Sequence, residues 1–561
     1  MHASQMGQST TGHNIANVDT EGFSRQEITQ AAAKPMSDGK GTGVNVTGVR
    51  RIQDQFTKEK VVDEQTFVGT WQTREKTLTE AEILYTDLEG SRLRGALDEF
   101  WGAWGSVANE PESATLRKSL LVKAQELTTD VRSFDSRLTD FNETLNARIT
   151  AEIQEVNQIT REVAILNKQV EQLEKRGLQA NDARDRRELL LQQLSEKIEL
   201  RWFESGRGTL EVQIPNGEHL VHGRKSFALT PIKTAVGAGD IRIGLTNASS
   251  IDSDITDIVK EGSLKELINQ RDGNISSYQD DLNEMVKEIA FRVNQLHTGG
   301  TGISGIKTSE ISTYPMSKEA IERPLPYLKT GSFEIKLLDD DQNISEILSI
   351  DLEAGVDTLE SLVRKINQAG GAYETTEDGR EVLKEVAKFK AEINGDGTIS
   401  ISSGLGQPFI YGKDETNILT VLGLNCFFHF TKGASDIRVN PELEENEMKI
   451  VAGSDLIPGD NRIAIEIAEL QFKPTMGDGT VSFDEFYNSQ ITDIGLKVLD
   501  AQKGLESHTQ MLEQYEALRD AVSSVNLDEE MTKMVKYQRA YESSAKFMST
   551  IDQMTQTLVN M

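Results

Sequence analysis

The sequence predicts a multidomain α+β protein in which a long α-helical bundle or coiled coil, built from both chain termini, carries inserted β-rich domains. Three features predict this fold class: helical apolar periodicity near both ends, a helical stretch without breakers between Pro111 and Gly177, and alternating strand patterns in the middle. The 561 residues are enough for about three or four domains.

The first residues predict a short helix, a turn and an exposed strand. Asn17, Asp19 and Gly22 favour helix caps and turns, so the helix should end near Asn17. Gly22 should take the positive φ that such a turn requires. Residues 41–49 then alternate as an exposed strand does.

A long helical stretch follows further along the chain. Between Pro111 and Gly177 there is neither proline nor glycine, and the apolar residues step by four and three. This spacing predicts long helices in a bundle or coiled coil, about 100 Å long if unbroken. The stepping residues begin with Leu127, Val131, Phe134, Leu138, Phe141 and Leu145. Gly177 should end the run, and Asn181 or Asp182 should cap a further helix through Ile198.

A change of pattern after this helix indicates strands. Residues 208–214 and 219–222 flank Pro215-Asn216-Gly217, which predicts a β-hairpin. A helix over 264–297 should return to the bundle. The glycine-rich residues 299–305 should form a flexible hinge.

The second half of the chain predicts a separate β-rich domain and then helices. Residues 325–430 contain strand patterns at 333–337 and 399–401, and one helical pattern at 358–368. The helical pattern resumes after Gly459. The predicted domains are an N-terminal axial helix and loop (1–55) that pairs with 520–561, a long-helix bundle domain (56–200), a β-hairpin segment (201–260), a helix returning to the bundle (261–305), an inserted β-rich outer domain (306–430), a return to the bundle (431–519) and a C-terminal axial helix (520–561).

Composition excludes several classes of partner. The chain has 60 Lys+Arg against 90 Asp+Glu, a formal net charge of -30, so nucleic acid and anionic membrane surfaces should both repel it. No stretch approaches the roughly 18 apolar residues of a membrane span. The first residues lack a basic start followed by an apolar run, so no cleaved secretory signal is expected. Cys426 is the one cysteine, which excludes an internal disulfide and a multi-cysteine zinc site.

The candidate chemical motifs all favour structural interpretations. Residues 39–43 are glycine-rich, but the alternating valines after them indicate a strand where a phosphate-binding loop needs a helix. Asp339-Asp340-Asp341 lacks the ligand spacing of a calcium loop and should be a solvated turn. Cys426 should be a buried, inert thiol because its neighbours are apolar.

His219 and His222 are the candidate metal ligands of the hairpin. Residues three apart on a strand point to opposite faces, and no carboxylate or cysteine cluster completes a coordination shell, so surface histidines of the hairpin are expected. The sequence therefore predicts no catalytic, cofactor-binding or metal-binding residues, and no enzyme.

The C-terminal helix carries two apolar faces, which suggests contact with more than one neighbour. The first face comprises Ala540, Phe547, Ile551, Met554, Leu558 and Met561, and the second comprises Leu527, Met531, Met534, Tyr541 and Met548. The alternative is an ordinary terminal helix packed on its own domain. A polar-apolar helix at each end that cannot bury its apolar face alone predicts a function in assembly.

Motifs at both ends resemble those of the flagellar hook-associated protein 1 family, within the superfamily of rod, hook and hook-associated axial proteins. The motifs are Asn14-Ile15-Ala16-Asn17 with Thr20 and Gly22-Phe23, the more specific Ser24-Arg25-Gln26, Gly41-Thr42-Gly43-Val44, Asn181-Asp182 with Arg187, Leu422-Gly423-Leu424-Asn425, and Val525–Glu530 with Tyr537-Gln538 and Tyr541. The resemblance extends along most of the chain and is loosest in the β-rich insert. The family's N-terminal helix begins upstream of Ala3, so a misplaced start is expected.

The resemblance implies a structural subunit at the hook–filament junction that adapts hook to filament. It implies an extracellular location in the bacterial flagellum after export through the flagellar secretion channel. The implied partners are further copies of the chain in a ring or tube, hook protein, a second junction protein of the hook-associated protein 3 type, and an export chaperone at the C-terminal helix, 526–561. No cofactor, nucleic acid or membrane is implied.

The resemblance and the terminal patterns together nominate an assembly interface. Asn14, Asn17 and Thr20 should end the first helix and hydrogen-bond the turn, and Phe23 should anchor that turn in the neighbouring helical layer. Leu527, Tyr537 and Tyr541 should pack between subunits. The full set is Asn14, Ile15, Asn17, Thr20, Gly22, Phe23, Ser24, Arg25, Gln26, Asn526, Leu527, Glu530, Met531, Tyr537, Gln538, Tyr541, Ile551 and Leu558.

Three alternatives stay open at this point. A flagellar hook or rod structural protein shares the paired ends, although Ser24-Arg25-Gln26 and the long helical run argue against it. A surface enzyme on an axial anchor, such as a peptidoglycan hydrolase, would need a carboxylate pair in a cleft. A cytosolic coiled-coil scaffold is the third.

Overall fold

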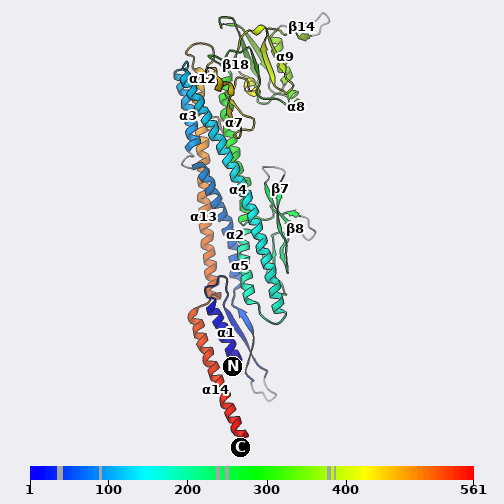
Figure 1. Ribbon diagram of the computed structural model, residues 1–561, viewed down its shortest axis with the longest axis vertical. Helices are drawn as coiled ribbons and strands as arrows, with labels where there is room; N and C mark the ends of the chain where they lie inside the picture. The colour runs from blue at the N-terminus through cyan, green and yellow to red at the C-terminus, as the bar shows by residue number, and fades with distance from the viewer. Residues whose placement is uncertain are drawn as a thin grey trace. The chain divides into compact units, whose positions relative to one another are not determined.

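The computed structural model describes residues 1–34, 42–86, 91–234, 240–246, 252–375, 381–383 and 387–560. The chain forms two compact units. Unit 1 comprises Met1–Glu80, Asn142–Asn274 and Leu496–Met561, and unit 2 comprises Ala81–Phe141 and Ile275–Gly495. The predicted α+β class with long helices is confirmed (Figure 1). Residues 35–41, which include most of the glycine-rich motif, lie outside the described residues.

Three helices have residues in both units: α2 (Gln55–Thr86), α4 (Ala114–Glu174) and α13 (Phe483–Ser523). α4 is a single helix of 61 residues, which confirms the prediction from the stretch without proline or glycine. The helix ends before Gly177, whose φ is +76°. The next helix begins at Asn181, but its N-cap is Ala180 and no side chain caps it, so the predicted cap at Asn181 or Asp182 is wrong. The Asn181 amide donates to Gln26 and to the Val49 carbonyl instead.

Unit 1 contains the two terminal helices and three small antiparallel sheets. The sheets have the strand orders β1-β2, β3-β4-β5-β6 and β7-β8-β9. Its elements, besides the shared helices, are α1 (His2–Ala16), β1 (Gln26–Ala32), β2 (Val44–Arg51), α5 (Asn181–Lys197), β3 (Arg201–Glu204), β4 (Leu210–Gln213), β5 (His219–His222), β6 (Lys225–Ser226), β7 (Leu229–Lys233), β8 (Ile241–Thr246), β9 (Asp252–Asp254), α6 (Ser263–Asn269), the π-helix Gln270–Ile275 and α14 (Leu527–Val559).

Asparagines on α4 attach the strands of unit 1 to the helix. The Asn167 side chain donates to the carbonyl of Leu210 at 2.8 Å and accepts from its N–H at 2.9 Å. Asn157 makes the same pair of bonds with Leu229. Because a strand edge otherwise leaves its backbone groups unpaired, these amides substitute for a neighbouring strand.

Unit 2 holds the β-rich region and its own helices. The predicted strands at 333–337 and 399–401 and the predicted helix near 358–368 are confirmed as β12, β17 and α9. The elements are α3 (Ser91–Asn109), α7 (Ser276–Thr298), β10 (Thr301–Gly302), β11 (Ser309–Ile311), α8 (Lys318–Ile321), β12 (Gly331–Leu338), β13 (Ile344–Leu352), α9 (Leu359–Ala369), β14 (Tyr373–Thr375), β15 (Glu381–Leu383), β16 (Phe389–Ile393), β17 (Ile399–Ser403), β18 (Phe409–Asp414), α10 (Ile418–Leu422), β19 (Phe428–His429), β20 (Arg438–Val439), α11 (Pro441–Glu445), β21 (Val451–Gly453) and α12 (Arg462–Ala468).

One apolar core lies under α9 and α10. It is built from buried side chains of β12, β13, β16, β17 and β18, among them Phe333, Phe389 and Phe409. α9 begins with a capping box in which the side chains of Thr358 and Ser361 each bond the other's backbone N–H. Cys426 is fully buried, and burial raises the pKa of its thiol, so the predicted inert thiol is confirmed.

The predicted flexible hinge at 299–305 is wrong. Thr301 and Gly302 form β10 and pair with β21. A Cβ at Gly300 would lie 2.4 Å from the carbonyl oxygen of Gly453, and one at Gly302 would lie 2.3 Å from that of Lys449. These glycines therefore allow the backbones to approach closely, a use of glycine that composition cannot distinguish from a linker.

The prediction that His219 and His222 point to opposite faces is also wrong. Val212 pairs with Val221 but Gln213 pairs with His219, so β5 carries one extra residue at a bulge. That residue changes the alternation, and Leu220 and Val221 are both fully buried. The two imidazoles consequently lie on one face, with ring centroids 4.7 Å apart.

Candidate assembly interface

The two terminal helices pack against each other within unit 1. α1 lies beside α14, as Figure 1 shows in blue and red. A Cβ at Gly7 would lie 2.7 Å from the Tyr537 ring, so the glycine allows the ring to sit on the helix backbone. Met534, one turn earlier on α14, approaches Gly12. Tyr537, which the sequence nominated for packing between subunits, thus packs inside its own chain.

Asn14 connects three elements through one side chain. Its amide nitrogen donates to the Gln26 carbonyl at 2.9 Å and to Glu530 Oε2 at 2.8 Å, and its oxygen accepts the Gln26 N–H at 3.0 Å. Asn14 and Glu530 are each 1% exposed. Lys533 pairs with the other Glu530 oxygen at 2.7 Å, so the buried carboxylate is neutralised. This network joins α1, β1 and α14.

The turn after α1 is closed by its own polar residues. α1 ends at Ala16, as predicted, and the Asn17 side chain donates to the His13 carbonyl at 2.9 Å. Thr20 Oγ1 donates to the Asn17 side-chain oxygen at 3.2 Å. Gly22 has φ +75°, which confirms the predicted positive φ. Phe23 meets His13 edge-to-face at 5.4 Å, so the ring packs back onto α1. Ile15, on the same helix, is half-buried.

The three residues after the turn bond to α5, to the start of α14 and to the segment before α14. The buried Ser24 gives its backbone N–H to Asp185 at 3.2 Å and receives a bond from Gln53. Arg25 pairs with Glu529 at 2.9 Å, and its N–H donates to the Ser523 carbonyl at 2.8 Å. Gln26 hydrogen-bonds Asn181 and Asp182 on α5.

A buried ion cluster lies behind this turn. Arg51 pairs with Asp185 and Glu188 at 2.8 Å each, and Lys58 pairs with Glu188 at 2.7 Å. All four side chains are at most 14% exposed. Burial opposes ionisation of Glu188, but the charges of Lys58 and Arg51 outweigh it and lower the pKa of Glu188. For Asp185, the effect of burial exceeds the opposing effect of the Arg51 charge, so the pKa of its carboxyl is raised.

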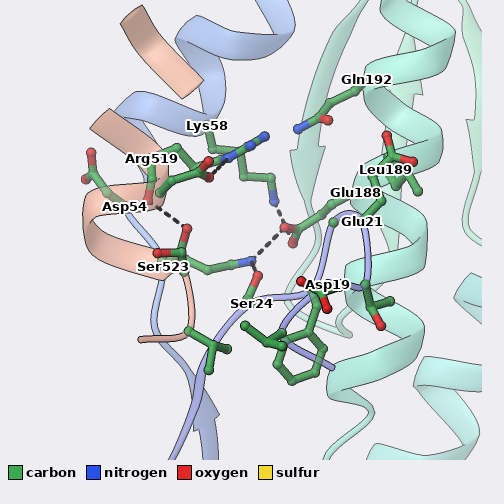
Figure 2. Close-up of a pocket in the computed structure, with 18 residues that line it drawn as sticks. Asp19, Glu21, Ser24, Asp54, Lys58, Glu188, Leu189, Gln192, Arg519 and Ser523 are labelled. Atoms are coloured by element: carbon green, nitrogen blue, oxygen red, sulfur yellow. Dashed lines mark hydrogen bonds and ion pairs between the residues drawn. The ribbon is translucent and has the colours of Figure 1, made fainter. Parts of the chain in front are cut away.

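The same segments line a cavity of about 300 Å³ within unit 1. Residues 18–24 form one wall, with the start of α2, part of α5, and residues 519–525 completing it. Figure 2 shows Asp19, Glu21, Asp54 and Arg519 around its rim. This cavity is therefore lined mostly by charged and polar groups around the terminal turn.

The first turn of α14 is capped by a side chain, and exposed apolar side chains continue along the rest of the helix. The Asn526 side chain accepts the N–H groups of Asp528 and Glu529, so its place is the N-cap of α14. Gln538 bonds Glu542 on the same helix, and Tyr541 is half-buried. The exposed apolar side chains of α14 are Leu527, Met531, Val535, Phe547, Met548, Ile551, Met554, Leu558 and Val559.

Most of the nominated residues thus fall into two groups, and Asn526, Tyr537, Gln538 and Tyr541 belong to neither. The N-terminal ones and Glu530 form a network inside the chain that holds α1, the turn and α14 together. Leu527, Met531, Ile551 and Leu558 are exposed instead and are free to meet another molecule. The sequence did not nominate Arg51, Lys58, Asp185 and Glu188, and the charge-rich run at 181–188 was the available signal. The terminal network and the exposed apolar side chains of α14 together suit a surface on which helices of another molecule dock.

Two further observations concern metal-ligating side chains and the apolar character of the helices. Among the described residues, one group brings metal-ligating side chains within 4.8 Å of one another, namely Glu211, His219 and His222 on the β4–β5 hairpin. Within the described part of the chain, no helix has the length and apolar character that crossing a bilayer requires.

Family models match the helical part and the C-terminus. The model described as flagellar hook-associated protein FlgK helical domain matches residues 78–311. The model described as flagellar basal body rod FlgEFG protein C-terminal matches residues 519–561.

Full-length relatives carry one name. The chain is similar to Flagellar hook-associated protein 1 of Salmonella typhimurium, at 23% identity over 575 residues that cover 100% of this chain and 98% of the relative. It is also similar to the proteins of that name from Escherichia coli, at 22% identity covering 100% and 98%, and Bacillus subtilis, at 22% identity covering 100% and 96%. Its fold is similar to the solved structure of the flagellar hook junction protein FlgK from Burkholderia pseudomallei, with a TM-score of 0.52 and 14% identity, over 82% of this chain and 100% of that chain.

Proposed function

The chain belongs to the flagellar hook-associated protein 1 family, and from this premise we propose that it joins hook to filament as a structural subunit of the bacterial flagellum. The family is one of flagellar structural proteins, and the terminal network described above suits such a role. Relatives bearing the name match the chain from end to end.

The observation that carries this proposal is the exposed apolar surface of α14, which comprises two faces of the helix. Large apolar side chains are exposed over several turns, for example Met531 at 59% on one face and Phe547 at 66% and Leu558 at 72% on the other. Exposed apolar surface of this extent marks a region that another molecule covers. The Asn14 network orients α1 against α14, so this surface is presented on a defined pair of helices.

The partners follow from the proposed place in the flagellum. Further copies of the chain, arranged in a ring or tube, cover the α14 surface laterally, and hook protein and a second junction protein of the hook-associated protein 3 type lie at the two ends. Before assembly, an export chaperone covers residues 526–561, and the chain leaves the cell through the flagellar secretion channel. The same helix serves both purposes because its exposed apolar side chains need cover before and after export.

A hook or rod protein is the alternative function. The match of a basal body rod C-terminal model to residues 519–561 favours it. That segment is the α14 region, which axial proteins share, so it does not distinguish between them. The full-length relatives favour the junction.

Electron microscopy of cells that lack the gene, with an assay of flagellin in the medium, tests the proposal. The junction role predicts complete hooks without filaments and flagellin shed into the medium. Missing hooks would support the rod or hook alternative, and normal filaments would exclude both.

A complementing allele with Ile551→Asp then tests the α14 face on which Ile551 lies. It should leave filaments absent, whereas Gln553→Asp, an exposed polar position two residues away, should restore them. Restoration by both alleles would show that the face is not used.

A further inference from the structure

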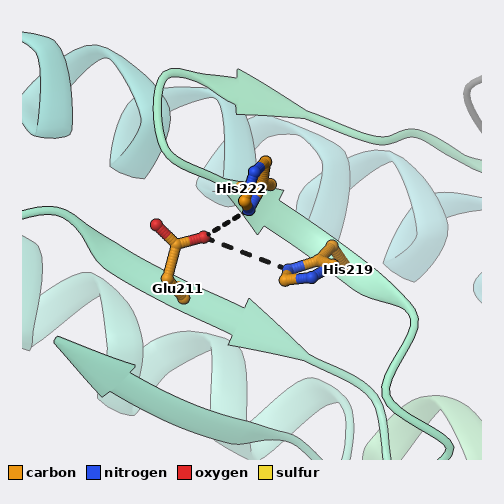
Figure 3. Close-up of side chains that lie close together, drawn as sticks. All are labelled: Glu211, His219 and His222. Atoms are coloured by element: carbon orange, nitrogen blue, oxygen red, sulfur yellow. Dashed lines mark hydrogen bonds and ion pairs between the residues drawn. The ribbon is translucent and has the colours of Figure 1, made fainter. Parts of the chain in front are cut away.

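The β4–β5 hairpin gathers polar side chains on one face. Because the bulge on β5 shifts the alternation by one residue, His219 lies opposite Gln213, and His222 lies near Glu211 (Figure 3). Glu211 points from β4 toward the two imidazoles. Leu220 and Val221, on the other side, are fully buried. The hairpin therefore presents two imidazoles and a carboxylate together.

Glu211 is held in place by groups that leave one oxygen for the histidines. Its side chain is 5% exposed. Thr209 Oγ1 donates to Oε1 at 2.9 Å, and the Gly223 N–H lies 3.1 Å from both oxygens. Oε2 faces His222 Nδ1 at 2.8 Å and His219 Nδ1 at 4.0 Å. A buried carboxylate oriented in this way is a typical metal ligand with an outer shell that fixes it.

One ring nitrogen of His219 faces Glu211 Oε2 without making a hydrogen bond to any described residue. Its Nδ1 is buried and has no hydrogen-bond partner among the described residues. The other ring nitrogen, Nε2, lies 3.1 Å from the amide nitrogen of Gln213. A metal on Nδ1 requires a proton on Nε2, so the Gln213 amide must turn over to place its oxygen, which accepts that proton, against the ring. Gln213 is thus the outer-shell partner of His219.

From these contacts we propose that Glu211, His219 and His222 bind a divalent transition-metal ion, with Zn²⁺ as the matching ion. Two imidazole nitrogens and one carboxylate oxygen, with a position open to water, form a common zinc shell. Ligand atoms in a tetrahedral zinc site lie roughly 3.3 Å apart, given bonds of about 2.0–2.1 Å. The two nitrogen-to-Oε2 distances, 2.8 and 4.0 Å, lie on either side of that value.

The site is open to solvent on one side and closed on the other. The His222 side chain is 64% exposed and that of His219 is 32% exposed, so an ion enters past the imidazoles. Bound zinc would connect residue 211 to 222 across the hairpin. Because the ion binds the folded hairpin, it stabilises the β3–β6 sheet by an amount that rises with the logarithm of its concentration above Kd.

Calorimetric titration of the metal-free full chain with ZnCl₂ at pH 7.5 tests the proposal. We expect one zinc per chain, and Co²⁺ in its place should give the visible absorption of a tetrahedral site. His219→Gln and His222→Gln should each weaken binding more than about 100-fold, and Gln213→Ala should weaken it about 10-fold. Glu211→Gln, which keeps the shape of the side chain, should weaken it as the histidine variants do.

His13→Ala is the matched control. His13 and Asp182 form a similar imidazole–carboxylate pair, 3.1 Å apart, without a second imidazole. This variant should bind zinc as the wild type does. Absence of binding at 100-fold excess zinc, or equal binding by wild type and both histidine variants, would overturn the proposal. Far-ultraviolet circular dichroism verifies that the variants are folded. If a histidine variant is unfolded, the zinc affinities of Glu211→Gln and Gln213→Ala test the proposal in its place.

Discussion

The Asn14→Ala substitution should detach α1 from β1 and α14 without unfolding the rest of the chain. The alanine removes three hydrogen bonds at once, two to the Gln26 backbone and one to Glu530. The groups left behind are buried, since Gln26 is 8% exposed and Glu530 is 1% exposed. Water cannot replace the lost partner at either position without local opening.

The size of the effect follows from the number of unpaired groups. Leaving a buried donor or acceptor unsatisfied costs about 1–3 kcal/mol each. Glu530 keeps its bond to Lys533, so its contribution lies at the low end. The three groups together give about 3–7 kcal/mol on the docking of α1. Since about 1.4 kcal/mol is tenfold, α1 should open at least about 100 times more often.

Hydrogen exchange measured by mass spectrometry gives the readout. Peptides covering α1 and β1 should lose protection in Asn14→Ala, while peptides from α9 in unit 2 should keep it. Ser9→Ala, an exposed position on the same helix, is the control and should exchange as the wild type does. Equal protection of α1 in both variants would refute the role assigned to Asn14.

Three further perturbations test separate parts of the structure. Gly7→Val should separate α1 from α14 because its side chain would overlap the Tyr537 ring, and Tyr537→Ala should restore helix pairing, as read by the same exchange assay. Gly22→Val should impair assembly while sparing unit 2, because valine disfavours φ +75°, and an unchanged filament count would contradict this. Burial lowers the pKa of His297 to about 3, with Nδ1 against the Asn425 carbonyl and Nε2 accepting the Val451 N–H. The stability of unit 2 should therefore be full above about pH 6.5 and fall by several kcal/mol as the pH drops toward 3, which thermal unfolding followed by tryptophan fluorescence measures against a flatter His297→Gln profile.

Much of the secondary structure could be predicted because local residues determine it. The end of α1 follows from Asn17 and Gly22, and the length of α4 follows from the absence of breakers between Pro111 and Gly177. α9 begins after its N-cap residue Thr358, whose capping box involves Ser361, three residues away. In each instance, the interactions that determine the element span at most a few turns.

The failures concern contacts between distant segments. A β-bulge depends on how two strands pair, so the alternation rule misplaced His219 relative to His222. Gly300 and Gly302 serve close backbone packing against residues about 150 positions away, which composition alone cannot distinguish from a linker. The ion cluster of Arg51 with Asp185 likewise joins segments more than 100 residues apart.

The terminal residues illustrate both outcomes. The sequence motif predicts that Asn14 belongs to the assembly interface, and it correctly indicates a residue with a structural role. Its three bonds lie inside the chain, however, so it positions the helices. Leu558, by contrast, is 72% exposed on α14 and stays a predicted contact between molecules.

The position of the protein in intact flagella tests the central claim most directly. Antibody labelling with gold particles, viewed by electron microscopy on flagella detached with their hooks, gives that position. The proposed function predicts gold at one narrow zone between hook and filament. Label distributed along the hook or the rod, or found only inside the cell, would contradict it.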